Sequence, residues 1–142
     1  MKNVTQLLQA KGKEIHSIGP DARVFDALRL MAEKDVGALV VTEGGRLAGI
    51  VSERDYARKV ILHGKSSHDI LVREIMTTKV ITVHPGQTVE DCMALMTSKR
   101  IRHLPVTDGE RLVGLLSIGD LVKEVIADQE ATIKQLESYI HS

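Results

Sequence analysis

The sequence predicts an α+β protein in which two copies of a strand–helix–strand–strand–helix unit pack about a pseudo-twofold axis, with helices flanking them at both termini. The first observation is an internal repeat. Residues 15–61 match residues 80–126 without a gap, and 17 of the 47 aligned pairs are identical. The second is that both copies contain strand-like and helix-like segments in the same order. The third is size, because one copy is too small to close a hydrophobic core comfortably and two facing copies can do so.

Each copy begins with a short apolar strand. The two strands are expected at Ile15–Ile18 and Val80–Val83, and Pro20 or Pro85 follows shortly after. Proline has no N–H to donate to a β-ladder, so it ends each strand.

An amphipathic helix follows in both copies. Its apolar residues recur at i, i+3, i+4 and i+7, which is one face of a helix. In the two copies these residues are Val24, Ala27, Leu28 and Met31, and then Val89, Cys92, Met93 and Met96. Thr88 is expected to cap the second of these helices, with Asp91 three residues later as the reciprocal partner.

A hairpin and a second helix complete each copy. The hairpin turns contain Gly44 in the first copy and Gly109 in the second, and the closing helices start near Arg54 and Gly119. The four hairpin strands are expected at Ala38–Thr42, Leu47–Ser52, Leu104–Thr107 and Leu112–Ser117.

The chain therefore divides into five expected segments. These are an N-terminal helix and lead-in (1–14), the first repeat (15–62), a polar linker with a short helix (63–79), the second repeat (80–127) and a C-terminal helix (128–142). The C-terminal helix is expected to continue the closing helix of the second repeat past Ala127, with Ile126, Ile133, Leu136 and Ile140 on one stripe. Such a stripe is typical of a face that packs on the body or on a partner subunit, and it favours a homodimer.

The composition limits what the protein does. Of its 142 residues 43% are hydrophobic and only 2% are aromatic, while nineteen basic side chains balance nineteen acidic ones. Nucleic-acid binders usually need a basic excess, and single-strand binders need aromatic stacking platforms, so this balance disfavours both. The single cysteine excludes an intramolecular disulfide, and no histidine pair has the helical spacing of a metal site. Without a long apolar run or a signal-peptide core, we expect a cytoplasmic protein with no membrane contact and no metal.

The most informative repeated segment lies where a strand gives way to a helix. Gly49–Asp55 and Gly114–Asp120 both consist of glycine, two aliphatic residues, serine, two variable residues and aspartate. A helix N-terminus offers free N–H groups to a phosphate, and an aspartate in the first turn can accept both hydroxyls of a ribose. The alternative is that serine and aspartate only cap the helix.

At these residues the sequence resembles the cystathionine-β-synthase (CBS) domain family, in the paired form called a Bateman module. The resemblance covers both repeats, about two-thirds of the chain, and includes Arg102–Val106 and the lead-in Val72–Thr77. Glu74 stands where the family often has aspartate. The resemblance implies a binding module for adenosyl ligands such as AMP, ATP, NAD or S-adenosylmethionine, which commonly dimerises and regulates another protein.

The family pattern implies two clefts between the repeats. Asp55 and Asp120 would bind ribose, and Ser52 and Ser117 would bind phosphate. In the Asp120 cleft Arg102 and His103 would face the phosphates. The adenine pockets would be lined by His16, Val36 and Leu115 in that cleft, and by Ile50, Val80, Ile81, Thr82 and Ile101 in the Asp55 cleft.

The two clefts are expected to differ in phosphate chemistry. The first-repeat counterparts of Arg102 and His103 are the uncharged Gly37 and Ala38, whereas Arg54 replaces the second repeat's Gly119. Arg102 could instead be a solvated arginine and His103 a packing histidine.

No pairing of a nucleophile with a base emerges from the sequence, so we expect a non-catalytic adenine-nucleotide sensor for an unknown effector protein. The alternatives are a ligand-free interaction scaffold or a weak nucleic-acid-binding protein.

Overall fold

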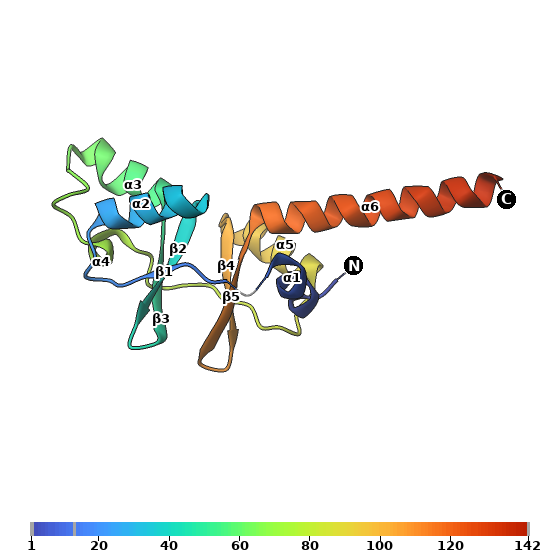
Figure 1. Cartoon of the computed structure of the whole chain (residues 1–142), viewed down its shortest axis with the longest axis horizontal. Coiled ribbons are helices and arrows are strands. Elements are labelled where there is room, and N and C mark those ends of the chain that lie inside the picture. Colours follow the sequence, from blue (N-terminus) through green and yellow to red (C-terminus); the bar gives the residue numbers. More distant parts are fainter. Residues whose placement is uncertain (1, 13, 142) are drawn as a thin grey trace. The chain divides into compact units, whose positions relative to one another are not determined.

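The computed structural model describes residues 2–12 and 14–141 (Figure 1). Within them the chain alternates helices and short strands in the predicted order. The elements are α1 (Val4–Lys11), β1 (Ser17–Ile18), α2 (Val24–Lys34), β2 (Ala38–Glu43), β3 (Arg46–Ser52), α3 (Glu53–Lys59), η1 (Ile61–His63), α4 (Val72–Ile75), α5 (Val89–Lys99), β4 (His103–Asp108), β5 (Arg111–Ser117) and α6 (Ile118–His141).

These elements form two compact units, each built around one repeat. The first-repeat unit comprises residues 14–81 and 109–112, and the second-repeat unit comprises the described residues of 2–12, 82–108 and 113–141. Each unit thus contains the lead-in helix that precedes the other repeat in sequence. Helix α1 belongs to the second-repeat unit, and α4 belongs to the first-repeat unit.

The first-repeat unit is a three-stranded sheet with helices packed on it. Strand β1 runs parallel to β2, and β2 pairs antiparallel with β3. The helix α2 buries the apolar face that its spacing predicts, including Val24, Ala27 and Met31. These residues form one core with Leu39, Val41, Val51, Val60, Val72 and Ile75.

The second-repeat unit repeats this plan with β4 paired to β5. Val83 forms a parallel bridge to Val106, at the position that β1 occupies in the first repeat. Thr88 and Asp91 form the predicted capping box at the start of α5, with hydrogen bonds of 3.1 Å in both directions. The buried apolar side chains of this unit are Val4, Leu7, Val83, Val89, Cys92, Met96, Leu104, Val106, Leu116 and Leu121.

The two lead-ins dock on the repeats through matching backbone hydrogen bonds. The Val4 amide donates to the Gln87 carbonyl at 2.9 Å, and the Val72 amide donates to the Ala22 carbonyl at 2.8 Å. The acceptors are 65 residues apart but the donors are 68 apart. The lead-ins are therefore also a repeat, displaced by three residues, and Lys11 corresponds to Lys79.

One region differs from the sequence-based expectation. The first strand of each copy is shorter than predicted, since β1 spans only Ser17–Ile18 and its second counterpart is the single bridge at Val83. The pairing is lost at the N-terminal end of each predicted strand, whereas the C-terminal ends at Ile18 and Val83 are kept before the prolines. Helix α6 runs unbroken from Ile118 to His141, so it continues past Ala127 as the apolar stripe predicts, and no glycine or proline interrupts it after its first turn.

Candidate functional site

The Asp55 region lies where β3 passes into α3. Ser52 is the N-cap residue, and its Oγ accepts a hydrogen bond from the Asp55 amide at 3.2 Å. Asp55 Oδ2 in turn accepts from the Ser52 amide at 2.9 Å. The predicted serine–aspartate pair is thus a reciprocal capping box in the first repeat.

The Asp120 region has the same arrangement between β5 and α6. Ser117 Oγ accepts from the Asp120 amide at 3.2 Å, and Asp120 Oδ2 accepts from the Ser117 amide at 2.7 Å. Both aspartates therefore have the capping role that the sequence left open. That role and the ion pair with Lys11 both engage Oδ2 of Asp120.

Lysine side chains neutralise both aspartates, but they come from different parts of the chain. Lys11, at the end of α1, donates from Nζ to Asp120 Oδ2 at 2.8 Å and also to the Leu115 carbonyl. In the first-repeat unit Lys59 lies 3.2 Å from Asp55 Oδ1 and donates to the Ile75 carbonyl at 2.8 Å. Each carboxylate thus faces an ammonium group that a main-chain carbonyl holds in place. Neither lysine was predicted for this role from the sequence.

His103 and Arg102 lie in the same unit as Asp120. Burial lowers the pKa of His103, and the positive charge of Lys11 lowers it further, while Asp120 acts in the opposite direction. For Asp120 itself, partial burial favours the neutral acid, but the hydrogen bonds from Lys11 and Ser117 outweigh this and lower its pKa. The second-repeat unit therefore presents an ionised carboxylate beside a half-buried imidazole and an exposed arginine.

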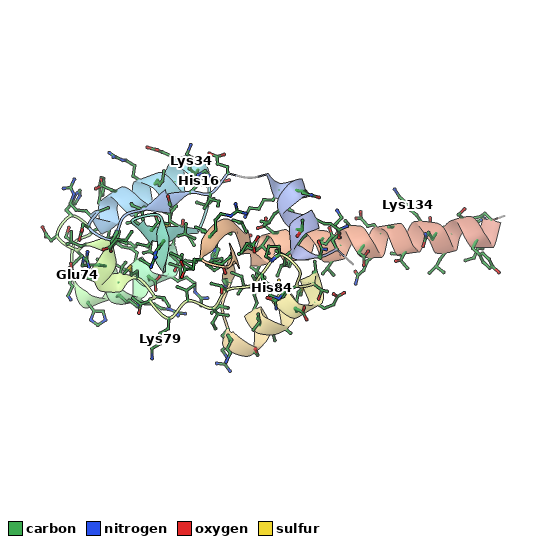
Figure 2. The ribbon with its side chains drawn as sticks, turned by 90° about the horizontal axis from the view of Figure 1, so that it is seen from below. His16, Lys34, Glu74, Lys79, His84 and Lys134 are labelled. Carbon is green, nitrogen blue, oxygen red and sulfur yellow. The ribbon has the colours of Figure 1, made fainter. Side chains whose placement is uncertain are left out.

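The remaining predicted site residues are divided between the units. Arg54 is exposed in the first turn of α3. The predicted adenine-lining residues in the first-repeat unit are His16 (Figure 2), Val36, Ile50, Val80 and Ile81, and those in the second-repeat unit are Thr82, Ile101 and Leu115. Each expected cleft draws on both units, so its adenine pocket stays a prediction.

Metal-binding clusters and membrane-spanning helices are absent from the described part of the chain. No cluster of three or more His, Cys, Asp or Glu side chains there is arranged to hold a metal ion. None of the described helices is both long and apolar enough to span a bilayer.

Comparison with known proteins identifies the family. The family model of the CBS domain matches residues 11–62 and again residues 72–127. The chain therefore belongs to the CBS domain family and contains two copies of the domain.

Several known proteins resemble this chain along most of its length. The mitochondrial CBS domain-containing protein CBSX3 of Arabidopsis thaliana is 40% identical, over 96% of this chain and 71% of the plant protein. A putative signal-transduction protein with CBS domains from Burkholderia ambifaria is 56% identical, with a TM-score of 0.87 over 90% of this chain and 96% of that structure. The CBS domain pair of protein MJ0100, solved with 5′-methylthioadenosine and S-adenosyl-L-methionine, is 24% identical; it has the same fold, with a TM-score of 0.80 over 90% of this chain and 98% of that one.

Proposed function

We propose that this protein is a non-catalytic regulatory module that binds a phosphate-bearing adenine nucleotide, of the AMP, ATP or NAD type, in clefts between its two CBS domains. The observation that carries the proposal is the matched pair of carboxylates at the N-termini of α3 and α6. Both are partly exposed, with side-chain exposures of 16% for Asp55 and 22% for Asp120. The adenosyl compounds bound by the CBS pair of MJ0100 support the ligand class.

In the proposed complex the ribose hydroxyls donate to the aspartate. Asp120 Oδ1 accepts one hydroxyl, and Oδ2 accepts the other in place of the Lys11 ammonium while keeping its bond to the Ser117 amide. Charge-assisted hydrogen bonds of this kind are worth about 1.5–3 kcal/mol each. They offset the loss of a partly exposed ion pair, which is worth about 1 kcal/mol or less.

The phosphate is bound by the positive groups around Asp120. In this proposal Lys11 moves from the carboxylate to the phosphate, where Ser117, Arg102 and His103 also donate. In the Asp55 cleft, Ser52 and Arg54 bind the phosphate instead. The two clefts therefore bind with unequal affinity, and the Asp120 cleft prefers the ligand with more negative charge.

In this proposal, nucleotide binding regulates a partner protein by favouring one of two conformational states of the module. We propose the cytoplasm as its location. A ligand shifts such an equilibrium only by its difference in affinity for the two states. An interaction scaffold without a ligand, or a weak nucleic-acid binder, is the competing function.

A thermal-unfolding titration with AMP, ATP, NAD, NADH and S-adenosylmethionine tests the proposal. A ligand at about 100 times its Kd stabilises the fold by about 2.7 kcal/mol. We expect phosphate-bearing ligands to raise the melting temperature and to do so less in Asp55→Ala and Asp120→Ala. If none of these compounds stabilises the protein, the scaffold is favoured, whereas stabilisation by RNA or DNA alone favours the nucleic-acid binder. Turnover of a bound nucleotide would show an enzyme.

A further inference from the structure

Helix α6 carries an apolar stripe that its own unit does not cover. Only Leu121 is buried along its 24 residues, and it lies near the start of the helix, which packs on α1 and α5. From residue 129 to residue 141 every side chain is exposed. The C-terminal part of α6 extends beyond α1 and α5 (Figure 1), and Lys134 lies on this extended part (Figure 2). The exposed apolar side chains include Val122 (42%), Ile126 (50%), Ile133 (54%), Leu136 (59%) and Ile140 (75%).

These residues have the spacing of a coiled-coil seam. From Val122 onward the seam positions are 122, 126, 129, 133, 136 and 140, so the intervals alternate between four and three residues. In heptad terms the a positions are Ile126, Ile133 and Ile140, and the d positions are Val122, Gln129 and Leu136. The seam is therefore about 28 Å long, and it is apolar at every position except Gln129.

We propose that this seam binds the same seam of a second copy of the chain, as a parallel two-stranded coiled coil. All three a positions are isoleucine, and of the d positions Leu136 is leucine; β-branched residues at a with leucine at d favour two parallel strands. The parallel alignment also places Gln129 opposite its own counterpart, where the two amides can hydrogen-bond to each other. A polar group in an otherwise apolar interface needs such a partner.

The antiparallel alignment fits these residues less well. It would set Gln129 against Ile133 of the second copy, which leaves the amide without a partner. It would also bring Glu130 next to its own counterpart, although Lys123 would then reach Glu137. In the parallel alignment the flanking g positions are Ile118, Val125, Thr132 and Tyr139, so no like charges meet across the seam.

The seam spans fewer than three heptads, so the two copies bind weakly. The fraction of dimer therefore changes over an accessible range of protein concentrations. It does not rest on nucleotide binding, because its residues lie beyond the first turn of α6 that holds Asp120. The two proposals can therefore fail separately.

Sedimentation velocity over a range of concentrations tests the seam. We expect a reversible monomer–dimer equilibrium for the unmodified chain. Ile133→Glu should weaken dimerisation by about tenfold or more, because it buries two charges at one a layer. The matched control is Ala131→Glu, which lies on the outer f position of the same exposed turn and should dimerise like the wild type. Both variants should keep the helical circular-dichroism signal of the monomer and the nucleotide response of the wild type.

Cross-linking tests the alignment. Gln129→Cys should form a disulfide-linked dimer under mild oxidation, because two cysteines bridge only when their Cα atoms are within about 7 Å. The wild type serves as the control, since its only cysteine, Cys92, is buried. A monomer at all concentrations, or a dimer that Ile133→Glu leaves unchanged, overturns the proposal. A disulfide that forms only when Gln129→Cys is mixed with Ile133→Cys overturns the parallel alignment.

Discussion

Gly49 and Gly114 occupy equivalent positions in the two repeats, yet the structure predicts unequal effects when each is replaced by alanine. A Cβ on Gly49 would lie 2.7 Å from the main-chain oxygen of Thr77 and 3.0 Å from the Met76 sulfur. A Cβ on Gly114 would lie 2.5 Å from a terminal methyl of Leu8. The first obstacle is backbone, whereas the second is the end of a half-buried side chain that can rotate away.

The backbone that obstructs Gly49→Ala is also fixed by hydrogen bonds. The Ile50 amide donates to the Thr77 carbonyl at 3.0 Å, and the Thr77 amide donates to the Ile50 carbonyl at 2.9 Å. Overpacking costs about 1–3 kcal/mol, and each disturbed hydrogen bond adds about 1 kcal/mol. We therefore expect Gly49→Ala to lower the free energy of unfolding by about 2–4 kcal/mol and Gly114→Ala by about 1 kcal/mol.

Urea unfolding followed by circular dichroism measures both free energies. Gly19→Ala is the control, because a Cβ there meets no atom within 4 Å, and its effect should stay within about 0.5 kcal/mol. Leu8→Ala should remove most of the cost of Gly114→Ala when the two are combined. Equal losses at Gly49 and Gly114, or a Gly49→Ala variant as stable as Gly19→Ala, would refute the packing of the lead-ins described above.

Four further predictions concern single side chains. The pKa of His103 is lowered in the folded protein, so the unfolded chain binds the proton more readily and the free energy of unfolding falls as the pH drops below about 6.5. In His103→Gln, the free energy of unfolding measured with urea should change less between neutral and mildly acidic pH. Arg100 adopts a left-handed conformation at φ 54° after α5, so Arg100→Gly should raise the free energy of unfolding by about 0.5–1 kcal/mol in the same assay. Burial raises the pKa of Cys92 to about 11, so iodoacetamide should modify it only in denaturant, and rapid labelling of the native protein would contradict the buried position. Lys11→Met should raise the pKa of Asp120 in an NMR titration, and an unchanged value would mean that the pair does not persist in solution.

Much of the fold could be predicted because the repeat doubles each local signal. The apolar residues that follow Val24 and Val89 have the same helical spacing, and Gly44 and Gly109 indicate a hairpin turn at the same position of each repeat. The continuation of α6 past Ala127 could be predicted because its apolar stripe runs on beyond the repeat and no helix-breaking residue lies there. The lead-in repeat was hidden from a gapless comparison because its offset is 68 rather than 65.

The candidate site was only partly predictable. A serine followed by an aspartate three residues later is the sequence pattern of a helix cap, so the pattern itself cannot separate capping from ribose binding. The Lys59–Asp55 pair has the ordinary helical spacing of four residues and could have been noticed. Lys11 lies 109 residues from Asp120, and only the packing of α1 brings them together.

Isothermal titration of AMP into Asp120→Asn, Asp55→Asn and Asp91→Asn tests the ribose-binding role of the two aspartates most directly. Asp91 is the matched control, since it forms the same capping box with Thr88 but lies at the start of α5, outside both predicted clefts. Asparagine keeps one oxygen for the cap and loses the second acceptor. We predict that Asp91→Asn binds AMP like the wild type, while Asp120→Asn and Asp55→Asn each weaken one binding event about tenfold or more. Equal AMP binding by all three variants would contradict the account.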